Sequence, residues 1–397
     1  MTAQSNILLL YLARALRGFG DGFAAVILPA YLALIGFDAA LIGVVAATAL
    51  FGTALSTLLI GFVAPRYDLR NLLIAGAAMM VATGLAFPQF ELPALVLLVA
   101  FLGTINPSTG DLGILIPLEH AMLAHGAADQ HRTNTFARYS FIGALAMAAG
   151  ALASGLPDVM ATYGIDNRMA FRTMFYAYAA LGLLSAFVYL RLPHAHVERR
   201  APTAPLGPSR RVVYKLSALF CLDAFAGGFA VQSMMALWLF ERFDLSLSAA
   251  GLFFFWSSVL SAFSFPMAAW IAKRIGLVNT MVYTHIPSSL CLIVAAFSPN
   301  LVVALALLLI RSALSQMDVP TRSSYVMAVV TPPERPAAAS VTAAPRTLAS
   351  SLSPALAGAL LGSSFMALPF VLCGTLKIVY DVALLFSFRH IKPPEEA

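Results

Sequence analysis

The sequence predicts an all-α membrane protein whose twelve transmembrane helices form two pseudo-symmetric bundles of six. Three observations predict this class. The chain is 60% hydrophobic and 11% charged, apolar stretches recur along all of it, and one long polar segment interrupts them near the middle. A soluble domain has about 25% charged residues, so this chain cannot hide its apolar surface from water. A soluble enzyme, a disordered chain and a nucleic-acid-binding domain are all excluded.

Each apolar stretch is long enough for a membrane-spanning helix, which needs about 20 residues. Six stretches lie before the polar segment, at residues 7–35, 39–63, 72–89, 95–122, 137–156 and 170–192. Six lie after it, at residues 213–240, 248–271, 278–298, 301–328, 338–362 and 367–387. We therefore predict an N-terminal bundle over residues 1–192, a linker over residues 193–212 and a C-terminal bundle over residues 213–397.

The loops that join the predicted helices differ in charge. One set carries most of the basic residues, whereas the opposite set has little beyond Arg168, Arg172 and Arg242. Loops rich in Lys and Arg stay on the cytoplasmic side of a membrane, so both termini and the linker are predicted to be cytoplasmic. The same bias explains the formal net charge of +6 without a nucleic-acid partner. The basic set consists of Arg66, Arg70, Arg132, Arg199, Arg200, Arg210, Arg211, Lys215, Lys273, Arg274, Arg335, Arg389 and Lys392.

Two short matches indicate that the two halves are related. Gly-Phe-Ala and Phe-Asp recur with the same spacing in the first and seventh predicted helices, at residues 22–24 and 37–38 and at residues 228–230 and 243–244. Arg138 precedes Gly-Ala-Leu in the fifth helix by the same interval that separates Arg346 from this triplet in the eleventh. The alignment places Arg17 opposite Asp223, so the sign of the charge is reversed between the halves.

Twelve spans, the division into six and six, the basic linker and the cytoplasmic termini together resemble the major facilitator superfamily. That family has a signature loop between its second and third helices, Gly-x-x-x-Asp-Arg-x-Gly-x-Arg. In the similar loop at residues 61–70, Gly61, Arg66 and Arg70 match, and Pro65 and Asp68 replace the acid and the second glycine. In layout the chain is most similar to short bacterial drug or metabolite:proton antiporters. The resemblance implies a monomeric transporter of a small molecule in the lipid bilayer of the bacterial inner membrane, with no cofactor and no metal.

Charged residues inside the apolar stretches mark the candidate site. A charge at the centre of a membrane helix costs about 2.5 to 3.5 kcal/mol on insertion scales, so it is kept where it lines a cavity, pairs with a partner or moves protons. In the first helix, Arg14, Arg17 and Asp21 share one face. Arg17 and Asp21 are four residues apart, so they either neutralise each other or line a cavity.

The resemblance places helices 1, 4, 7 and 10 around a central cavity, and each of them carries such residues. Helix 10 has a polar stripe on one face, at positions 311, 315, 318, 322 and 325. An unbroken stripe of this kind is expected to face a water-filled pathway or the opposing bundle rather than lipid. The predicted pathway for substrate and protons consists of Arg17, Asp21, Asp111, Asp223, Arg311 and Asp318.

Further charges lie in the cytoplasmic third of their helices, where we predict a gate made of salt bridges between the halves. This gate consists of Glu119, Arg138, Arg322 and Arg346. Lys377 and Asp381 are four residues apart on the twelfth helix and are predicted to pair with each other. His285, near the start of the ninth helix, is predicted to have no part in the site.

The charges of the predicted cavity nearly cancel, which favours a zwitterion, a weak acid or a lipophilic solute exchanged for protons. Asp21, Asp111 and Asp223 are the candidates for proton coupling, with the two bundles alternating in access around a midplane site. Efflux by proton antiport is the leading interpretation. Uptake or exchange of a small organic anion bound by Arg17 and Arg311 is the alternative. A membrane-embedded enzyme is less favoured, because no His cluster, nucleophile with its base or phosphate-binding loop is apparent. A receptor is less favoured, because it would usually add a soluble signalling domain and the predicted tails are only a few residues long.

Overall fold

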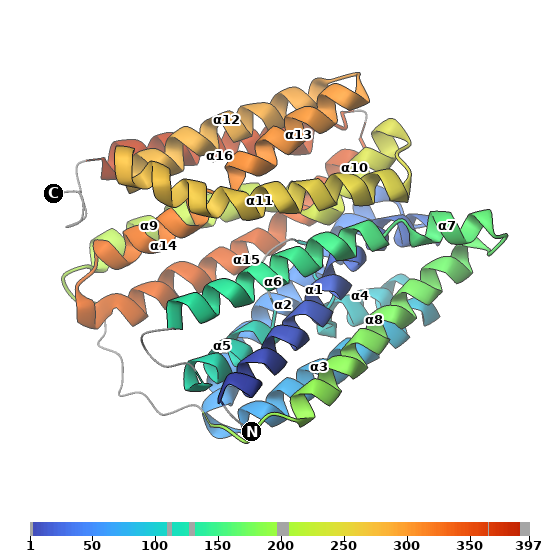
Figure 1. Ribbon diagram of the computed structural model, residues 1–397. Helices are drawn as coiled ribbons and strands as arrows, with labels where there is room; N and C mark the ends of the chain where they lie inside the picture. The colour runs from blue at the N-terminus through green and yellow to red at the C-terminus, as the bar shows by residue number, and fades with distance from the viewer. Residues whose placement is uncertain (1–2, 109–112, 127–131, 197–205, 364, 390–397) are drawn as a thin grey trace. The chain divides into compact units, whose positions relative to one another are not determined.

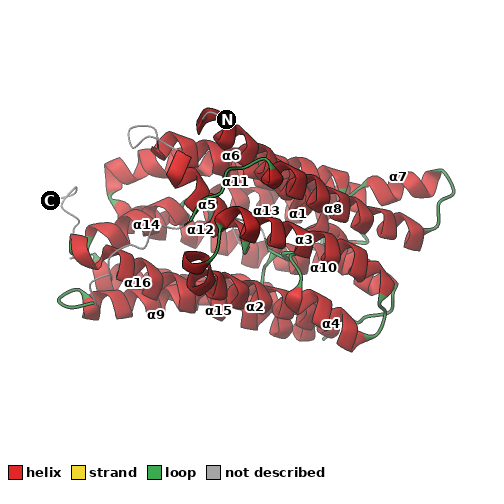
Figure 2. Ribbon diagram, turned by 90° about the horizontal axis from the view of Figure 1, so that it is seen from below, coloured by secondary structure: helices red, strands yellow, loops and turns green. Residues whose placement is uncertain are grey.

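The described part of the protein is built from helices. The computed structural model describes residues 3–108, 113–126, 132–196, 206–363 and 365–389. Within these residues every regular element is a helix and none is a strand (Figures 1 and 2). The predicted all-α class is confirmed.

The helices follow one another with short connections. The first eight are α1 Ala3–Leu34, α2 Ala39–Val63, α3 Leu69–Ala86, α4 Pro93–Leu102, α5 Leu115–Gly126, α6 Arg132–Ala153, α7 Leu156–Thr162 and α8 Asn167–Leu190. The second eight are α9 Arg210–Gly228, α10 Gln232–Phe243, α11 Leu247–Ile275, α12 Leu277–Phe297, α13 Leu301–Ser315, α14 Asp318–Ala328, α15 Arg335–Leu361 and α16 Leu368–Phe388. Three short 3₁₀ helices are η1 Ala64–Arg66, η2 Phe87–Gln89 and η4 Pro332–Glu334.

Nine helical segments of the described chain are long and apolar enough to cross a membrane. They are Ala39–Arg66, Leu69–Gln89, Thr135–Thr162, Asn167–Leu190, Arg210–Phe243, Leu247–Ile275, Leu277–Phe297, Leu301–Ala328 and Leu368–Phe388. Each overlaps one of the twelve predicted spans. The other three predicted spans correspond to α1, to α4 with α5, and to α15. With 32 and 27 residues, α1 and α15 are also long enough, but they carry charged or many small polar residues. The count of twelve stays a prediction.

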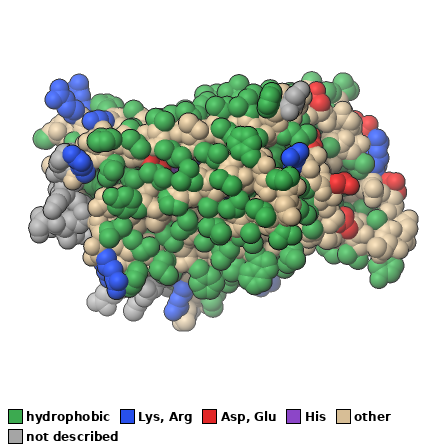
Figure 3. All heavy atoms as spheres, turned by 90° about the horizontal axis from the view of Figure 1, so that it is seen from above, with side chains coloured by type: hydrophobic (Ala, Val, Ile, Leu, Met, Phe, Trp, Pro, Cys, Tyr) green, Lys and Arg blue, Asp and Glu red, His purple; other side chains and the backbone are tan. Residues whose placement is uncertain are grey.

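The surface of the helices is apolar over much of its area. Figure 3 shows hydrophobic side chains covering most of the face that it draws. Large apolar side chains such as Phe263, Val302 and Phe386 are about two-thirds exposed or more, at 67%, 73% and 66%. Soluble proteins rarely expose apolar patches on this scale. This surface is the one expected of helices that contact lipid, and the chain is an integral membrane protein.

Contacts divide the chain into two compact units. Unit 1 contains residues 1–199 and 231–258, and unit 2 contains residues 200–230 and 259–397. In unit 1, α1 packs mainly on α6 and α8, and α3 packs on α8. In unit 2, α9 packs on α15 and α16, and α12 packs on α13 and α16. The predicted bundle boundaries at residues 192 and 213 are left as a prediction.

Glycines that the sequence repeat aligns make equivalent contacts inside their own units. A Cβ on Gly22 of α1 would lie 2.1 Å from the backbone oxygen of Met147 on α6. A Cβ on Gly228 of α9 would lie 2.5 Å from the backbone oxygen of Ser350 on α15. Only glycine lets the helix backbones approach this closely. The repeat therefore marks the same helix–helix contact in each unit.

Three of the predicted spans are interrupted helices, and these are helices 4, 7 and 10 of the predicted order. The first break follows Leu102, where residues 103–108 are not helical. The second lies between Gly228 and Gln232, and the third lies between Ser315 and Asp318. The expected unbroken stripe on helix 10 is thus divided between α13 and α14. Non-helical backbone at membrane depth must be covered by protein or water. In the first break, the carbonyl oxygen of Pro107 is satisfied by protein, because it accepts from the N–H of Ser233 at 3.0 Å.

Candidate functional site

Arg17 is the centre of a buried polar cluster in unit 1. Its guanidinium pairs with the carboxylate of Glu119 on α5 and donates to the hydroxyl of Tyr189 on α8 at 3.1 Å. It lies 3.4 Å from the hydroxyl of Tyr139 on α6. Both tyrosines also donate to Glu119, whose side chain is fully buried. Each charge is therefore matched by an opposite charge and by hydrogen bonds, which is what a buried ion pair requires.

Asp21 lies one helical turn from Arg17 but has a different partner. The carboxylate that pairs with Arg17 is that of Glu119, whereas Asp21 accepts a hydrogen bond from the hydroxyl of Tyr178 at 3.3 Å. That hydroxyl is also 3.1 Å from the hydroxyl of Thr104, beside the break that follows α4. Neutralisation of Arg17 by Asp21 is one of the two alternatives that the sequence leaves open, and in the structure Arg17 instead pairs with a carboxylate on another helix.

A small cavity lies beside Asp21 in unit 1. Its walls include Arg17, Asp21, Thr104, Leu115 and Tyr178. The cavity has about 30 Å³ of space, which is room for about one water molecule rather than an organic solute. In this conformation the predicted pathway residues of α1 are thus within reach of a water molecule, and a solute would need the cavity to enlarge.

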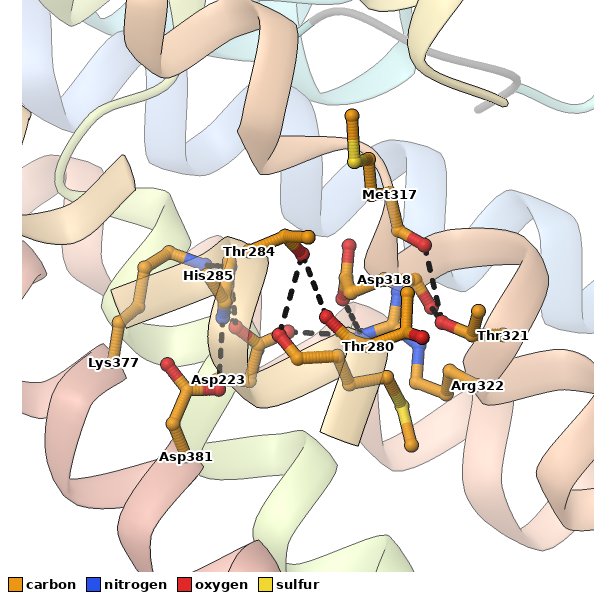
Figure 4. A network of polar contacts seen from close by, with 11 residues as sticks. Asp223, Thr280, Thr284, His285, Met317, Asp318, Thr321, Arg322, Lys377 and Asp381 are labelled. Atoms are coloured by element: carbon orange, nitrogen blue, oxygen red, sulfur yellow. Dashed lines mark hydrogen bonds and ion pairs between the residues drawn. The ribbon is translucent and has the colours of Figure 1, made fainter. Parts of the chain in front are cut away.

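Asp223 is the centre of a second cluster, which lies in unit 2 (Figure 4). Its Oδ1 accepts from the ammonium of Lys377 on α16 at 2.7 Å, and its Oδ2 accepts from the guanidinium of Arg322 on α14 at 2.9 Å. Arg322 also pairs with Asp318 one turn earlier, at 3.0 Å. The structure therefore brings together two predicted pathway residues and one predicted gate residue.

His285 of α12 joins this cluster through both ring nitrogens, although it is predicted above to have no part in the site. Its Nδ1 lies 3.1 Å from Oδ1 of Asp381, and its Nε2 lies 3.3 Å from the ammonium of Lys377 (Figure 4). The predicted pairing of Lys377 with Asp381 is wrong, because Lys377 turns to Asp223 on α9 and Asp381 turns to His285. The sequence offers one indication that Lys377 and Asp381 belong to a site, which is that they are charged and lie four residues apart on an otherwise apolar helix.

The remaining predicted residues lie outside these contacts. Arg346 on α15 is within electrostatic range of Asp223 and Asp318, and Arg311 on α13 is within range of the thiols of Cys291 and Cys373. Arg138 is exposed on α6, and Asp111 lies outside the described residues. The ion pairs of Glu119 and Arg322 each join residues of one unit, and the proposed gate between halves stays a prediction.

Comparison with known proteins identifies the family. The sequence matches the Major Facilitator Superfamily in two overlapping stretches, residues 10–317 and 222–397. The chain belongs to the major facilitator superfamily. As in that family of transporters, it is a secondary transporter of a small molecule and not an enzyme.

Relatives in sequence and structure agree with this assignment. The chain is 25% identical to an uncharacterized membrane protein of Saccharomyces cerevisiae, YJR124C, over 97% of this chain and 94% of that protein. Its fold is similar to the nucleoside transporter NupG, with a TM-score of 0.76 at 15% identity over 96% of this chain and 100% of the other. The xylose transporter XylE from E. coli is similar with a TM-score of 0.76 at 15% identity over 98% and 97%. These likenesses establish the superfamily fold.

Proposed function

We propose that this superfamily member couples transport of a small organic solute to protons by alternating access. The observation that carries the proposal is the pairing of Asp21. Its hydrogen bond comes from a neutral hydroxyl, that of Tyr178, and a cavity of water size lies beside it. Asp223, in contrast, holds a cation at each oxygen. Asp21 is therefore the better placed of the two carboxylates to take up and release a proton.

We propose export in exchange for protons as the direction of transport. The layout, similar to that of short exporters in the family, supports this direction. We place the protein in a bacterial inner membrane as a monomer with both termini in the cytoplasm, on the distribution of Lys and Arg between its loops.

Uptake or exchange of a small organic anion is the second candidate. Arg311 favours it, because the neighbours that affect this guanidinium in the described structure are thiols rather than carboxylates. Arg17 favours it less, since an anion at this position would compete with Glu119 and two tyrosine hydroxyls.

The test begins with a thermal-shift screen of the purified protein against metabolites and drugs. A solute that raises the melting temperature is then loaded into proteoliposomes, and its flux is measured with and without a pH gradient of either sign. Asp21→Asn is expected to abolish gradient-driven accumulation and to spare solute exchange without a gradient. If Asp21→Asn still concentrates the solute, Asp21 is not the coupling residue. If wild-type flux ignores the gradient, proton coupling itself is wrong.

A further inference from the structure

The contacts of His285 define its hydrogen-bonding state. Nδ1 faces a carboxylate oxygen of Asp381, which accepts, so Nδ1 carries a proton. Nε2 faces the ammonium of Lys377, which has only donors, so Nε2 carries none. The imidazole is therefore neutral in this arrangement, and its Nε2 lone pair helps to hold Lys377 against Asp223.

We propose that His285 is a proton-binding site that controls whether Lys377 pairs with Asp223. When Nε2 takes a proton from water, it becomes a donor and can no longer accept from Lys377. The nearest carboxylate oxygen for this new donor is Oδ1 of Asp223, 4.0 Å away, which is the oxygen that Lys377 now occupies at 2.7 Å. The protonated imidazole and the ammonium thus compete for one acceptor.

The charges around His285 decide which cation leaves. From α16 it faces Lys377, Asp381 and the ring of Tyr380, and from α9 it faces Asp223. The charged groups that surround this set are Arg322 and Asp318 on α14, Arg346 on α15 and Arg311 on α13.

A proton on His285 would place three cations around the single carboxylate of Asp223. Arg322 stays, because it also pairs with Asp318. Lys377 leaves, because its side chain is the most exposed of those in contact with Asp223, at 13% against 7% for Arg322 and 2% for His285.

Asp381 makes this protonation possible at a buried position. Its side chain has no exposed surface, and its second oxygen is buried without a hydrogen-bond partner among the described residues. A buried carboxylate with one neutral partner is costly, and a charged partner offsets that cost. Asp381 therefore stabilises the imidazolium, whereas Lys377 opposes it for as long as it remains in contact.

The released ammonium becomes available to an anionic group, such as a carboxylate of the transported solute. This inference rests on the proposed proton coupling and adds a second proton site to Asp21, in the other unit. A proton and an anionic group that bind in the same state move in the same direction. The His285 site thus supports the second candidate function, in the form of proton-linked movement of an organic anion.

The experiment is an NMR titration of the full-length protein in lipid nanodiscs, with ¹⁵N in the histidine rings and in the lysine side chains. The chain has seven histidines and four lysines, at positions 215, 273, 377 and 392, so the signals can be assigned with His285→Gln and Lys377→Arg. As the pH falls from about 8 to 5, where histidine titrates, we expect the signals of His285 and Lys377 to shift with one midpoint. Lys273 is the control and should not shift with them.

The variants make the result decisive. In His285→Gln, the Lys377 signal should no longer respond in this pH range. In Asp381→Asn, which keeps an acceptor for Nδ1–H, the two signals should still shift together, because the contact between Nε2 and the Lys377 ammonium is unchanged.

Three outcomes would overturn the inference. They are a His285 that stays neutral to pH 5, a Lys377 signal that is constant while His285 titrates, and a Lys377 response that survives His285→Gln. If His285→Gln does not fold, the Asp381→Asn arm decides alone. The titration needs no solute, so its failure is distinct from a failure of proton-driven flux.

Discussion

In unit 1 the buried charge of Arg17 meets one carboxylate and two tyrosine hydroxyls, whereas in unit 2 the buried charge of Asp223 meets two cations and a nearby imidazole. The first charge is on α1 and the second on α9, the two helices that the internal repeat aligns. Each is paired across to the second segment of an interrupted span, with Glu119 on α5 and Arg322 on α14. The acid and the base have exchanged places between the units.

The two clusters differ in whether Arg17 or Asp223 can lose one partner and still keep a partner of opposite charge. In unit 1, Arg17 and Glu119 depend on each other, and the tyrosine hydroxyls that complete the cluster do not change charge near neutral pH. In unit 2, Asp223 has two basic partners, and each of these has a further contact, to Asp318 or to His285. One partner can therefore leave without stranding a charge. We expect unit 1 to respond to substitution mainly through stability, and unit 2 mainly through function.

The largest effect is expected from Glu119→Gln, which leaves Arg17 buried without its carboxylate. Removing one member of a buried pair costs about 3 to 5 kcal/mol, because the other charge stays uncompensated. The melting temperature of the purified protein in detergent should fall strongly. The control is Arg17→Gln with Glu119→Gln, which removes both charges and should melt closer to wild type. A single variant that melts like wild type would show that Arg17 has another compensating group.

A smaller effect is expected from Asp223→Asn. Arg322 keeps a second carboxylate, that of Asp318, at 3.0 Å. Lys377 loses its carboxylate and keeps Nε2 of His285 at 3.3 Å, but its side chain is 13% exposed, against 5% for Arg17, so water offsets part of the loss. We expect a loss of about 1 to 3 kcal/mol, the range for a hydrogen bond to a charged group, measured by the same melting assay. The matched comparison is Glu119→Gln. If Asp223→Asn destabilises as much or more, the second cluster is not the more tolerant one.

The positions of the spans could be predicted from the sequence, but the partners inside them could not. The length of an apolar stretch predicts where a helix crosses the membrane. Charged residues inside these stretches mark Arg17 and Asp223 as candidate site residues. Their partners are 102 and 99 residues away, so they depend on which helices pack together. Lys377 and Asp381 show the limit most clearly, because the i, i+4 rule pairs them while packing turns each towards another helix. The break between α9 and α10 also carries no hydropathy signal, since residues 228–231 are apolar throughout.

The smallest effect concerns the two carboxylates that hold the ends of the linker, one in each unit. In unit 1, Asp68 caps α3 and accepts from the N–H of Ala195 at 3.0 Å. In unit 2, Glu334 accepts from the N–H of Gly207 and from the hydroxyl of Ser209. Hydrogen bonds from Ser209 and then Thr331 lower the pKa of Glu334 from its ordinary 4.5 to about 2.

A carboxylate whose pKa falls on folding stabilises the native contact above its unfolded pKa, and this contribution is lost as the pH drops through the folded value. Protection of residues 206–212 from hydrogen exchange, corrected for the intrinsic rate, should thus decline between pH 4.5 and 2. In Glu334→Gln the same segment should exchange a few-fold faster at pH 6 and lose this pH dependence, because an amide accepts more weakly than a carboxylate and does not titrate. Asp68→Asn is the counterpart in unit 1 and should leave residues 206–212 unchanged. Equal loosening of this segment by both substitutions would mean that the two ends of the linker are not held independently.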